Sequence, residues 1–175
     1  MSRRRRRLDP VPRLRVGLGY DVHPLVAGRP LVIGGVVIDH PTGLDGHSDA
    51  DVLTHAVIDA ILGAAALGNI GQHFPAGDPR YRGISSLDLL SMAAVLVHAA
   101  RYRVVNVDSV VVAEAPRLQS HLAAMSANLA GRLGLEVGAI GVKATSPEAV
   151  GALGRGEGIA AQAVALVERS RTRKS

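Results

Sequence analysis

Cysteine and tryptophan are absent from this 175-residue chain, and aromatic residues make up only 2% of it. Without cysteine the chain forms no disulfide, and any metal that it binds must be held by histidine and carboxylate side chains. With a single phenylalanine, the core must be built from alanine, valine, leucine and isoleucine. The scarcity of aromatic rings also argues against a single-strand nucleic-acid binder, because such proteins stack bases on aromatic side chains.

The excess positive charge lies near the two ends of the chain. The formal net charge is +5, but without the five consecutive arginines at 3–7 the remaining 15 basic residues balance the 15 acidic ones. Arg169, Arg171, Arg173 and Lys174 add positive charge at the other end. Basic arms can bind nucleic-acid phosphates, but short charged termini are more often solvated and unstructured. We therefore expect a flexible basic arm at 1–12 and a basic tail at 169–175, with no nucleic-acid partner.

Long hydrophobic runs are also missing, so we expect no membrane partner. The arginine run is followed by LDPVPRLRV, which lacks the apolar segment of a secretory signal. We therefore expect a cytoplasmic protein with one domain over 13–168, long enough to bury a substantial core.

Strand and helix patterns alternate along this domain. Strands are predicted at 13–22, 104–113, 137–144 and 158–167, the last in preference to a helix because the preceding GRGEG would start a helix poorly. Residues 31–38 are β-branched and broken by Gly34 and Gly35, which predicts a hairpin or a bulge. Helices are predicted at 48–64, 85–101 and 118–133, with a loop at 69–83. The interleaving predicts the α/β (or α+β) class in one layered domain.

The stretch GLGYDVHPL at 17–25 ends the first predicted strand and raises a specific question. It places Asp21 and His23 two residues apart, so both side chains project to the same face of the strand. A carboxylate and an imidazole on one face can bind each other, bind a metal, or do neither. The helix predicted at 48–64 helps to decide among these three possibilities.

That helix carries Asp51, His55 and Asp59 at intervals of four residues, which forms one polar stripe. Ser48 or Asp49 is expected to cap it, with Asp51 in its first turn. The stripe alone is compatible with an ordinary solvated face.

Together with the strand, however, the helix completes a possible metal site. Asp21, His23 and His55 would offer one oxygen and two nitrogens, which suits zinc and leaves a fourth position open for catalysis. Asp51 or Asp59 could then orient a ligand histidine through its second ring nitrogen.

A third stretch, VKATSPEAVGALGRGEGIA at 142–160, combines hydroxyls, charges and glycines. Gly154, Gly156 and Gly158 could let backbone N–H groups approach an anion closely. Glycine-rich turns are common, so this feature alone does not establish phosphate binding.

Taken in order, these motifs resemble the 2-C-methyl-D-erythritol 2,4-cyclodiphosphate synthase family. The matching pieces are GLGYDVHPL, GHSDADVLTHAVIDAILGAAALGNIG, HFP, EAPR, KATSPE and GRGEGIAAQAVAL, from about Arg15 to Val167. The resemblance implies a homotrimer of subunits with a mixed β-sheet flanked by helices, and active sites between neighbouring subunits. It also implies a reaction of non-mevalonate isoprenoid biosynthesis, in which 4-diphosphocytidyl-2-C-methyl-D-erythritol 2-phosphate is cyclised and CMP is released.

The resemblance also implies roles for individual residues. Asp21, His23 and His55 match the ligands of one zinc ion per subunit, and Glu148 matches the ligand of a magnesium or manganese ion. His47 and Ser146 match the residues that stabilise the transition state. The positions that match substrate-binding residues are Asp21, His23, His47, Ser48, Asn69, Ile70, Gly71, Phe74, Asp78, Arg117, Thr145, Ser146, Glu148 and Arg155.

Several positions depart from the family pattern, among them Ser146 and Pro147 in place of threonines and Arg117 in place of lysine. Asn69 stands where aspartate is usual, Ala76 lacks a carboxylate, and Ala152 replaces an aromatic residue beside the cavity expected on the trimer axis. Two rival hypotheses therefore stay open. One is a zinc hydrolase that activates water against a phosphoester. The other is a non-catalytic homologue that binds a nucleotide or a prenyl diphosphate.

Overall fold

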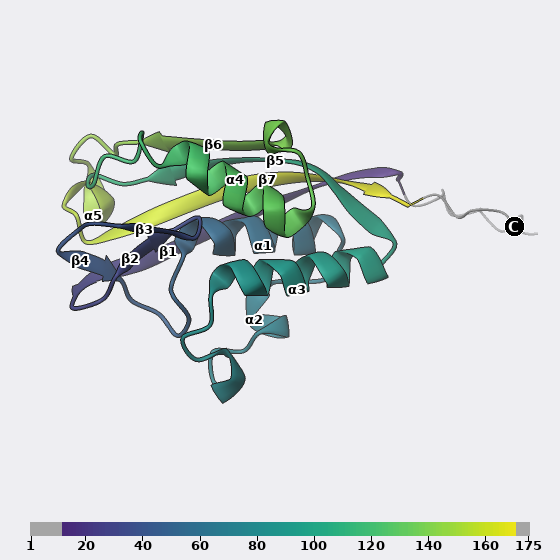
Figure 1. The fold of residues 1–175 in the computed structure, drawn as a ribbon, viewed down its shortest axis with the longest axis horizontal. Helices are drawn as coiled ribbons and strands as arrows, with labels where there is room; N and C mark the ends of the chain where they lie inside the picture. The colour runs from purple at the N-terminus through teal and green to yellow at the C-terminus, as the bar shows by residue number, and fades with distance from the viewer. Residues whose placement is uncertain (1–11, 171–175) are drawn as a thin grey trace, which may run out of the picture.

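A five-stranded mixed sheet forms one layer of the fold, and helices form the other (Figure 1). We describe residues 12–170 from a computed structural model. The strand order is β4-β1-β7-β5-β6, in which β5 and β6 are parallel and the other neighbours are antiparallel. The strands are β1 (Leu14–Ala27), β4 (Thr42–Leu44), β5 (Tyr102–Val112), β6 (Ile140–Thr145) and β7 (Gly158–Arg169). The predicted α/β class in a single domain is confirmed.

The three longer helices lie on the same side of this sheet (Figure 1). They are α1 (Val52–Ala64), α3 (Ser86–Ala99) and α4 (Leu122–Leu133). Two short helices, α2 (Ile70–His73) and α5 (Gly151–Gly154), and two 3₁₀ turns, Pro79–Tyr81 and Val137–Ala139, lie in the connections. Within 12–170, no helix has the length and apolar character needed to cross a membrane.

Helix α1 lies directly against the backbone of β1, and two glycines permit this close approach. A Cβ atom on Gly19 would fall 1.9 Å from the carbonyl oxygen of Ala56, and one on Gly17 would fall 2.1 Å from that of Ala60. Both distances are far below van der Waals contact, so no larger residue fits without moving the helix. The glycines therefore set the distance between the helix and the strand.

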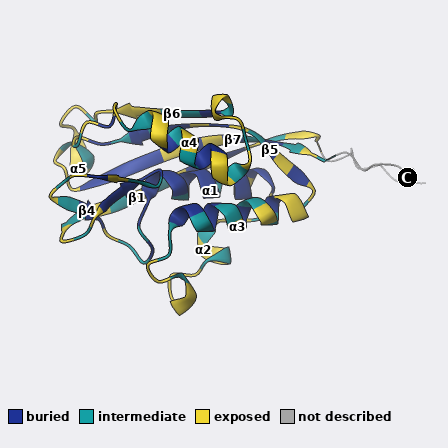
Figure 2. Ribbon diagram, viewed as in Figure 1, coloured by how far each residue is buried: buried dark blue, intermediate teal, exposed yellow. Residues whose placement is uncertain are grey.

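The core between the two layers is aliphatic, as the composition predicts (Figure 2). Among its largest fully buried side chains are Leu31, Ile33, Leu53, Ile58, Ile61, Leu62, Leu90, Met125, Leu129 and Ile159. The opposite face of β1 is different, because Val16, Leu18 and Tyr20 alternate with the buried glycines and are 66%, 68% and 53% exposed. One face of the sheet is thus packed, and the other presents apolar side chains to the surface.

Several local predictions are confirmed. Residues 31–38 form the hairpin of β2 (Leu31–Ile33) and β3 (Val36–Ile38). Gly34 and Gly35 make its turn with φ values of 57° and 69°, a region that glycine occupies without strain. The strand preferred at 158–167 is β7.

The boundaries of several elements differ from the predicted ones. Helix α1 begins after Asp51, whose side chain accepts the Thr54 N–H, so the predicted caps Ser48 and Asp49 are wrong. Helix α4 begins at Leu122 rather than at 118, and the predicted loop at 69–83 contains α2 and a 3₁₀ turn. At the ends, the predicted arm at 1–12 lies outside the described residues except for Pro12, as do residues 171–175 of the predicted tail, whereas Arg169 closes β7.

Candidate metal centre and active site

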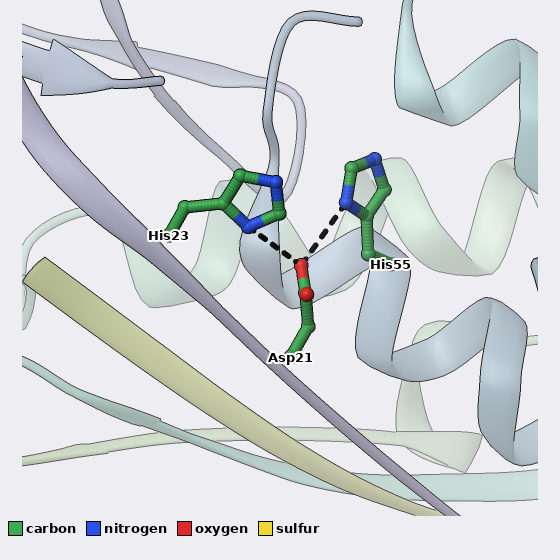
Figure 3. A group of neighbouring side chains, drawn as sticks. All are labelled: Asp21, His23 and His55. Atoms are coloured by element: carbon green, nitrogen blue, oxygen red, sulfur yellow. Dashed lines mark hydrogen bonds and ion pairs between the residues drawn. The ribbon is translucent and has the colours of Figure 1, made fainter. Parts of the chain in front are cut away.

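The side chains of Asp21, His23 and His55 converge between β1 and α1 (Figure 3). Asp21 and His23 project from the β1 face that α1 covers, and His55 comes from the first turn of α1. Oδ2 of Asp21 lies 2.9 Å from Nδ1 of His23 and 3.0 Å from Nδ1 of His55. One ligand atom from each residue lies within 4.8 Å of the others, which is close enough for all three to bind one ion.

The chemistry of this cluster fits a metal ion. Among the described residues, the buried Nδ1 of His23 has no hydrogen-bond partner, although it lies 2.9 Å from the Asp21 oxygen. Two imidazole nitrogens and one carboxylate oxygen are a ligand set that zinc prefers. A cation among them would satisfy the unpaired nitrogen, so the residues present fit the predicted zinc site.

The electrostatics of the cluster favour an ionised carboxylate. Burial of Asp21 opposes its ionisation, but the hydrogen bond with His55 and the attraction of His23 and His55 outweigh burial and hold the pKa of Asp21 well below its usual value. Burial likewise opposes protonation of His55, but the hydrogen bond to Asp21 and the charges of Asp51 and Asp49 raise its pKa. Asp21 is therefore ready to bind a cation, which requires the deprotonated ligand.

A cavity of about 230 Å³ opens beside the cluster. Besides the three candidate ligands it is lined by His47, Ser48, Ile70, Gly71, Phe74, Ala76, Tyr81 and Leu89. The structure thus brings five of the predicted substrate-binding residues beside the metal ligands. Sequence reasoning missed Tyr81 and Leu89, because neither belongs to a motif.

The other two members of the polar stripe on α1 do not orient a histidine. Asp51 is fully buried, and its carboxylate accepts the N–H groups of Gly34, Gly35 and Thr54 at 2.7–3.0 Å. Asp59 accepts the N–H of Ile70 at 2.7 Å. The expectation that either would support a ligand histidine is wrong, and so is the solvated-face alternative, because Asp51 links α1 to the β2–β3 turn.

Comparison with known proteins identifies the family. The profile of the YgbB family matches residues 14–168. The chain belongs to the YgbB family. The 2-C-methyl-D-erythritol 2,4-cyclodiphosphate synthase of Bordetella petrii is 57% identical over 156 residues, which cover 89% of this chain and 96% of that one.

Two further relatives agree with this placement. The synthase of Synechococcus sp. (strain CC9311) is 54% identical over 160 residues, covering 90% of this chain and 96% of that one. Among solved structures, the IspF–CDP complex of Plasmodium falciparum is similar with a TM-score of 0.79 and 29% identity, covering 90% of this chain and 97% of that one.

A second cavity of this YgbB-family chain holds other predicted site residues. It has a volume of about 390 Å³ and shares no lining residue with the first. Its lining consists of Ala113, Glu114, Pro116, Arg117, Leu118, Gln119, Ala144, Thr145 and Ser146. Three predicted substrate-binding residues, Arg117, Thr145 and Ser146, therefore lie together but apart from the metal ligands.

Sheet register relates the two cavities. Val22 of β1 pairs with Ala160 of β7, which pairs with Val112 of β5, which in turn pairs with Thr145 of β6. Both cavities thus lie at the same end of the sheet, and β1 and β6, which lead into them, are three strand spacings apart, or about 14 Å. Within one chain, the candidate metal ligands and Ser146 therefore line different cavities.

The segment that carries Ser146 is organised by Glu114, a residue of the EAPR motif to which the sequence assigned no individual role. Oε2 of Glu114 accepts the Ser146 hydroxyl at 3.1 Å and the Ala149 N–H at 3.2 Å, and Ser146 Oγ accepts the Glu148 N–H at 2.9 Å. Glu148 and Ala149 have φ values of 55° and 59°, which L-residues adopt at a cost. These bonds hold an otherwise exposed segment in one conformation.

Four other predicted residues line neither cavity. Asn69 caps α2, and Asp78 caps the 3₁₀ turn and pairs with Arg80 at 2.6 Å. The Glu148 side chain is exposed, and Arg155 pairs with Glu157 at 2.6 Å. None of these four residues is therefore part of the lining beside the candidate metal ligands in a single chain.

Proposed function

We propose that this chain cyclises 4-diphosphocytidyl-2-C-methyl-D-erythritol 2-phosphate to 2-C-methyl-D-erythritol 2,4-cyclodiphosphate with release of CMP. The observation that carries the proposal is the convergence of Asp21, His23 and His55 beside a cavity, in a YgbB-family chain that is 57% identical to a synthase of that name. The activity is that of a phosphorus–oxygen lyase in non-mevalonate isoprenoid biosynthesis.

The reaction needs charge neutralisation more than a strong base. An oxygen of the substrate's 2-phosphate attacks the β-phosphorus, and the bond from that phosphorus to the bridging oxygen breaks, so CMP leaves and no water is consumed. The attacking phosphate is already anionic near neutral pH, because its second pKa is about 6. The barrier therefore arises mainly from bringing two anionic phosphates into line.

The residues of the first cavity suit this task. Asp21, His23 and His55 would hold a zinc ion, which supplies positive charge at the phosphate oxygens when bound. His47 and Ser48 line the same cavity and would donate hydrogen bonds to those oxygens. Ile70 and Phe74 give the cavity apolar walls that exclude water, which strengthens each of these interactions.

We call each cavity a half-site, because the two together would form one active site. The second half-site would bind the diphosphate and the nucleotide. Arg117 and Thr145 offer donors to phosphate, and Ser146 is assigned to stabilise the transition state with His47. Glu148 would hold a magnesium or manganese ion on the diphosphate. The partner is thus a small cytidine diphosphate compound rather than a nucleic acid or a membrane, and a soluble nucleotide substrate of this kind suits a cytoplasmic enzyme.

Joining the two half-sites requires a second copy of the chain, and we assign the assembly as a homotrimer. The exposed apolar side chains of β1 and β7, among them Leu18, Tyr20 and Val164, support this assembly because large exposed apolar patches mark interaction surfaces. With this face buried between subunits, Ser146 of one subunit would face the metal ligands of the next.

Phosphorus NMR of the purified protein with this substrate, zinc and magnesium tests the proposal. We expect CMP and a cyclic diphosphate to appear together, and a metal chelator to suppress both. A linear phosphate product would indicate the zinc hydrolase instead. Retention of the substrate without CMP, by protein that has bound zinc, would indicate the non-catalytic binding homologue.

A further inference from the structure

The ring of His55 has a second set of contacts on the side away from Asp21. Its Nε2 lies 2.8 Å from Oγ of Ser86. Ser86 is the first residue of α3 and is fully buried. The Ser86 hydroxyl in turn donates to Oδ1 of Asp49. Oδ2 of Asp49 also accepts the backbone N–H of Ser86 at 3.0 Å. Asp49, Ser86 and His55 therefore form a continuous chain that leads to the metal cluster.

The direction of each hydrogen bond in this chain follows from proton counting. An ionised carboxylate can only accept hydrogen bonds, and a serine hydroxyl has one proton to give. Because Ser86 gives its proton to Asp49, the oxygen of Ser86 can only accept from His55. Nε2 of His55 must then carry a proton. A metal ion that takes the place of the proton between Nδ1 and Asp21 would therefore meet the lone pair of the ring on Nδ1.

Nδ1 is the nitrogen of His55 that faces the cluster, 3.0 Å from Asp21 Oδ2. We infer that Asp49 and Ser86 are positioning residues that fix the ring orientation and the tautomer of His55 for metal binding. The inference rests on the metal site of the proposed function. It extends the rule that a metal-bound histidine donates its other N–H to an acceptor, here a serine that is itself oriented by a carboxylate.

Ser48 is a weaker competitor for the same nitrogen. Its Oγ lies 3.2 Å from Nε2 of His55 and already accepts the N–H of Ala50 at 3.1 Å. The contact of His55 with Ser86 is shorter than its contact with Ser48. Ser86 is also hydrogen-bonded to the carboxylate of Asp49, and hydrogen bonds to a charged group are stronger than neutral ones. Ser86 therefore sets the tautomer, and Ser48 stays available to the cavity that it lines.

The first test measures zinc affinity, by competition with a chromophoric chelator, in metal-stripped protein and its variants. Ser86→Ala should weaken zinc binding by about 10- to 100-fold, the range known for removal of such supporting groups. Ser85→Ala is the matched control, because Ser85 precedes α3 and makes no side-chain capping bond. The control should bind zinc as tightly as the unaltered chain.

Asp49→Asn distinguishes an oriented chain from simple packing. The backbone N–H of Ser86 is fixed, so the amide oxygen of the new side chain should face it and the NH₂ group should face the Ser86 hydroxyl. That hydroxyl must then turn and donate to Nε2 of His55, which favours the wrong tautomer. We expect Asp49→Asn to weaken zinc binding more than Ser86→Ala does, and the double variant to return to the level of Ser86→Ala.

Nitrogen-15 NMR of the zinc-loaded protein shows which ring nitrogen of His55 carries the proton. A purely structural role of Asp49 and Ser86 would not determine this property. The His55 ring should carry its proton on Nε2 and bind zinc through Nδ1. Wild-type zinc affinity in Ser86→Ala, or zinc bound through Nε2 of His55, would overturn the inference. Absence of zinc binding in the unaltered chain would overturn it together with the metal assignment, whereas zinc binding without CMP release would overturn the proposed function alone.

Discussion

The candidate metal cluster and the segment that carries Ser146 are built in opposite ways. The candidate metal ligands come from a long strand and a long helix, and their side chains are only 12–24% exposed. Ser146 and Glu148, by contrast, lie in an exposed segment after β6 whose backbone includes two left-handed residues. The difference follows the demands of each task. Metal ligands need fixed geometry, whereas under the proposed function the segment with Ser146 would be completed by the substrate and by a neighbouring subunit.

The largest effect should follow from removing a metal ligand. His55→Ala deletes one of two imidazole ligands, so bound zinc should be lost and CMP release should fall by about 10³-fold or more. Metal content by mass spectrometry and CMP release measure the two effects. His121→Ala, at the start of α4 and without a side-chain capping bond, serves as the control. Undiminished CMP release from zinc-free His55→Ala protein would show that the metal is not part of the reaction.

A smaller effect, on stability as well as on the site, should follow from filling the space beneath α1. In Gly19→Ala the new methyl group would collide with the Ala56 carbonyl, 1.9 Å from the ideal Cβ position. We expect a loss of about 3 kcal/mol in the free energy of unfolding, because overpacking forces the backbone to move. Weaker zinc binding should accompany it, since His55 moves with α1.

Denaturant unfolding and the chelator competition measure both quantities for Gly19→Ala. Gly138→Ala is the control, because nothing lies within 4 Å of the added Cβ. Equal stability of the two variants would mean that α1 is not held against β1 by this contact.

A substitution in the exposed half-site should lower turnover less than loss of a metal ligand does, and it should leave the bound zinc in place. Ser146→Ala removes one hydrogen-bond donor to the transition state, so turnover should fall by about 10²-fold at unchanged metal content.

Mixing Ser146→Ala subunits with His55→Ala subunits sharpens the comparison further. If each active site joins two subunits, mixed assemblies contain some intact sites, and part of the CMP release should return. No recovery in assemblies shown to contain both variants would place both half-sites in one subunit.

Local sequence patterns predicted the pair of candidate metal ligands on β1, whereas the third ligand, His55, lies 34 positions from Asp21 and was added because its helix could complete a metal-binding set. Alternation along β1 placed Asp21 and His23 on one face, and these are the side chains that meet His55. The same logic failed for Asp51, whose partners Gly34 and Gly35 lie on a separate hairpin. Such contacts depend on how distant elements pack, and periodicity carries no information about them.

The same limit applies to the supporting residues. Ser86 reaches His55 across 31 positions of sequence, and Glu114 reaches Ser146 across 32. Neither serine nor glutamate is unusual where it stands, at a helix start or before a proline. Their roles become visible only once the chain is folded.

The glycine face of β1 also has a consequence for how the chain folds. Gly17, Gly19, Asp21 and His23 occupy alternate positions, so a slip of β1 by one residue would turn the ligands outward and press Leu18 and Tyr20 against α1. Only the correctly paired strand can present both ligands to His55. Because an ion would bind that arrangement and not the slipped one, its binding would add to the free-energy gap between correct and incorrect pairing. Metal supply would then act as a check on strand pairing as well as a requirement for turnover.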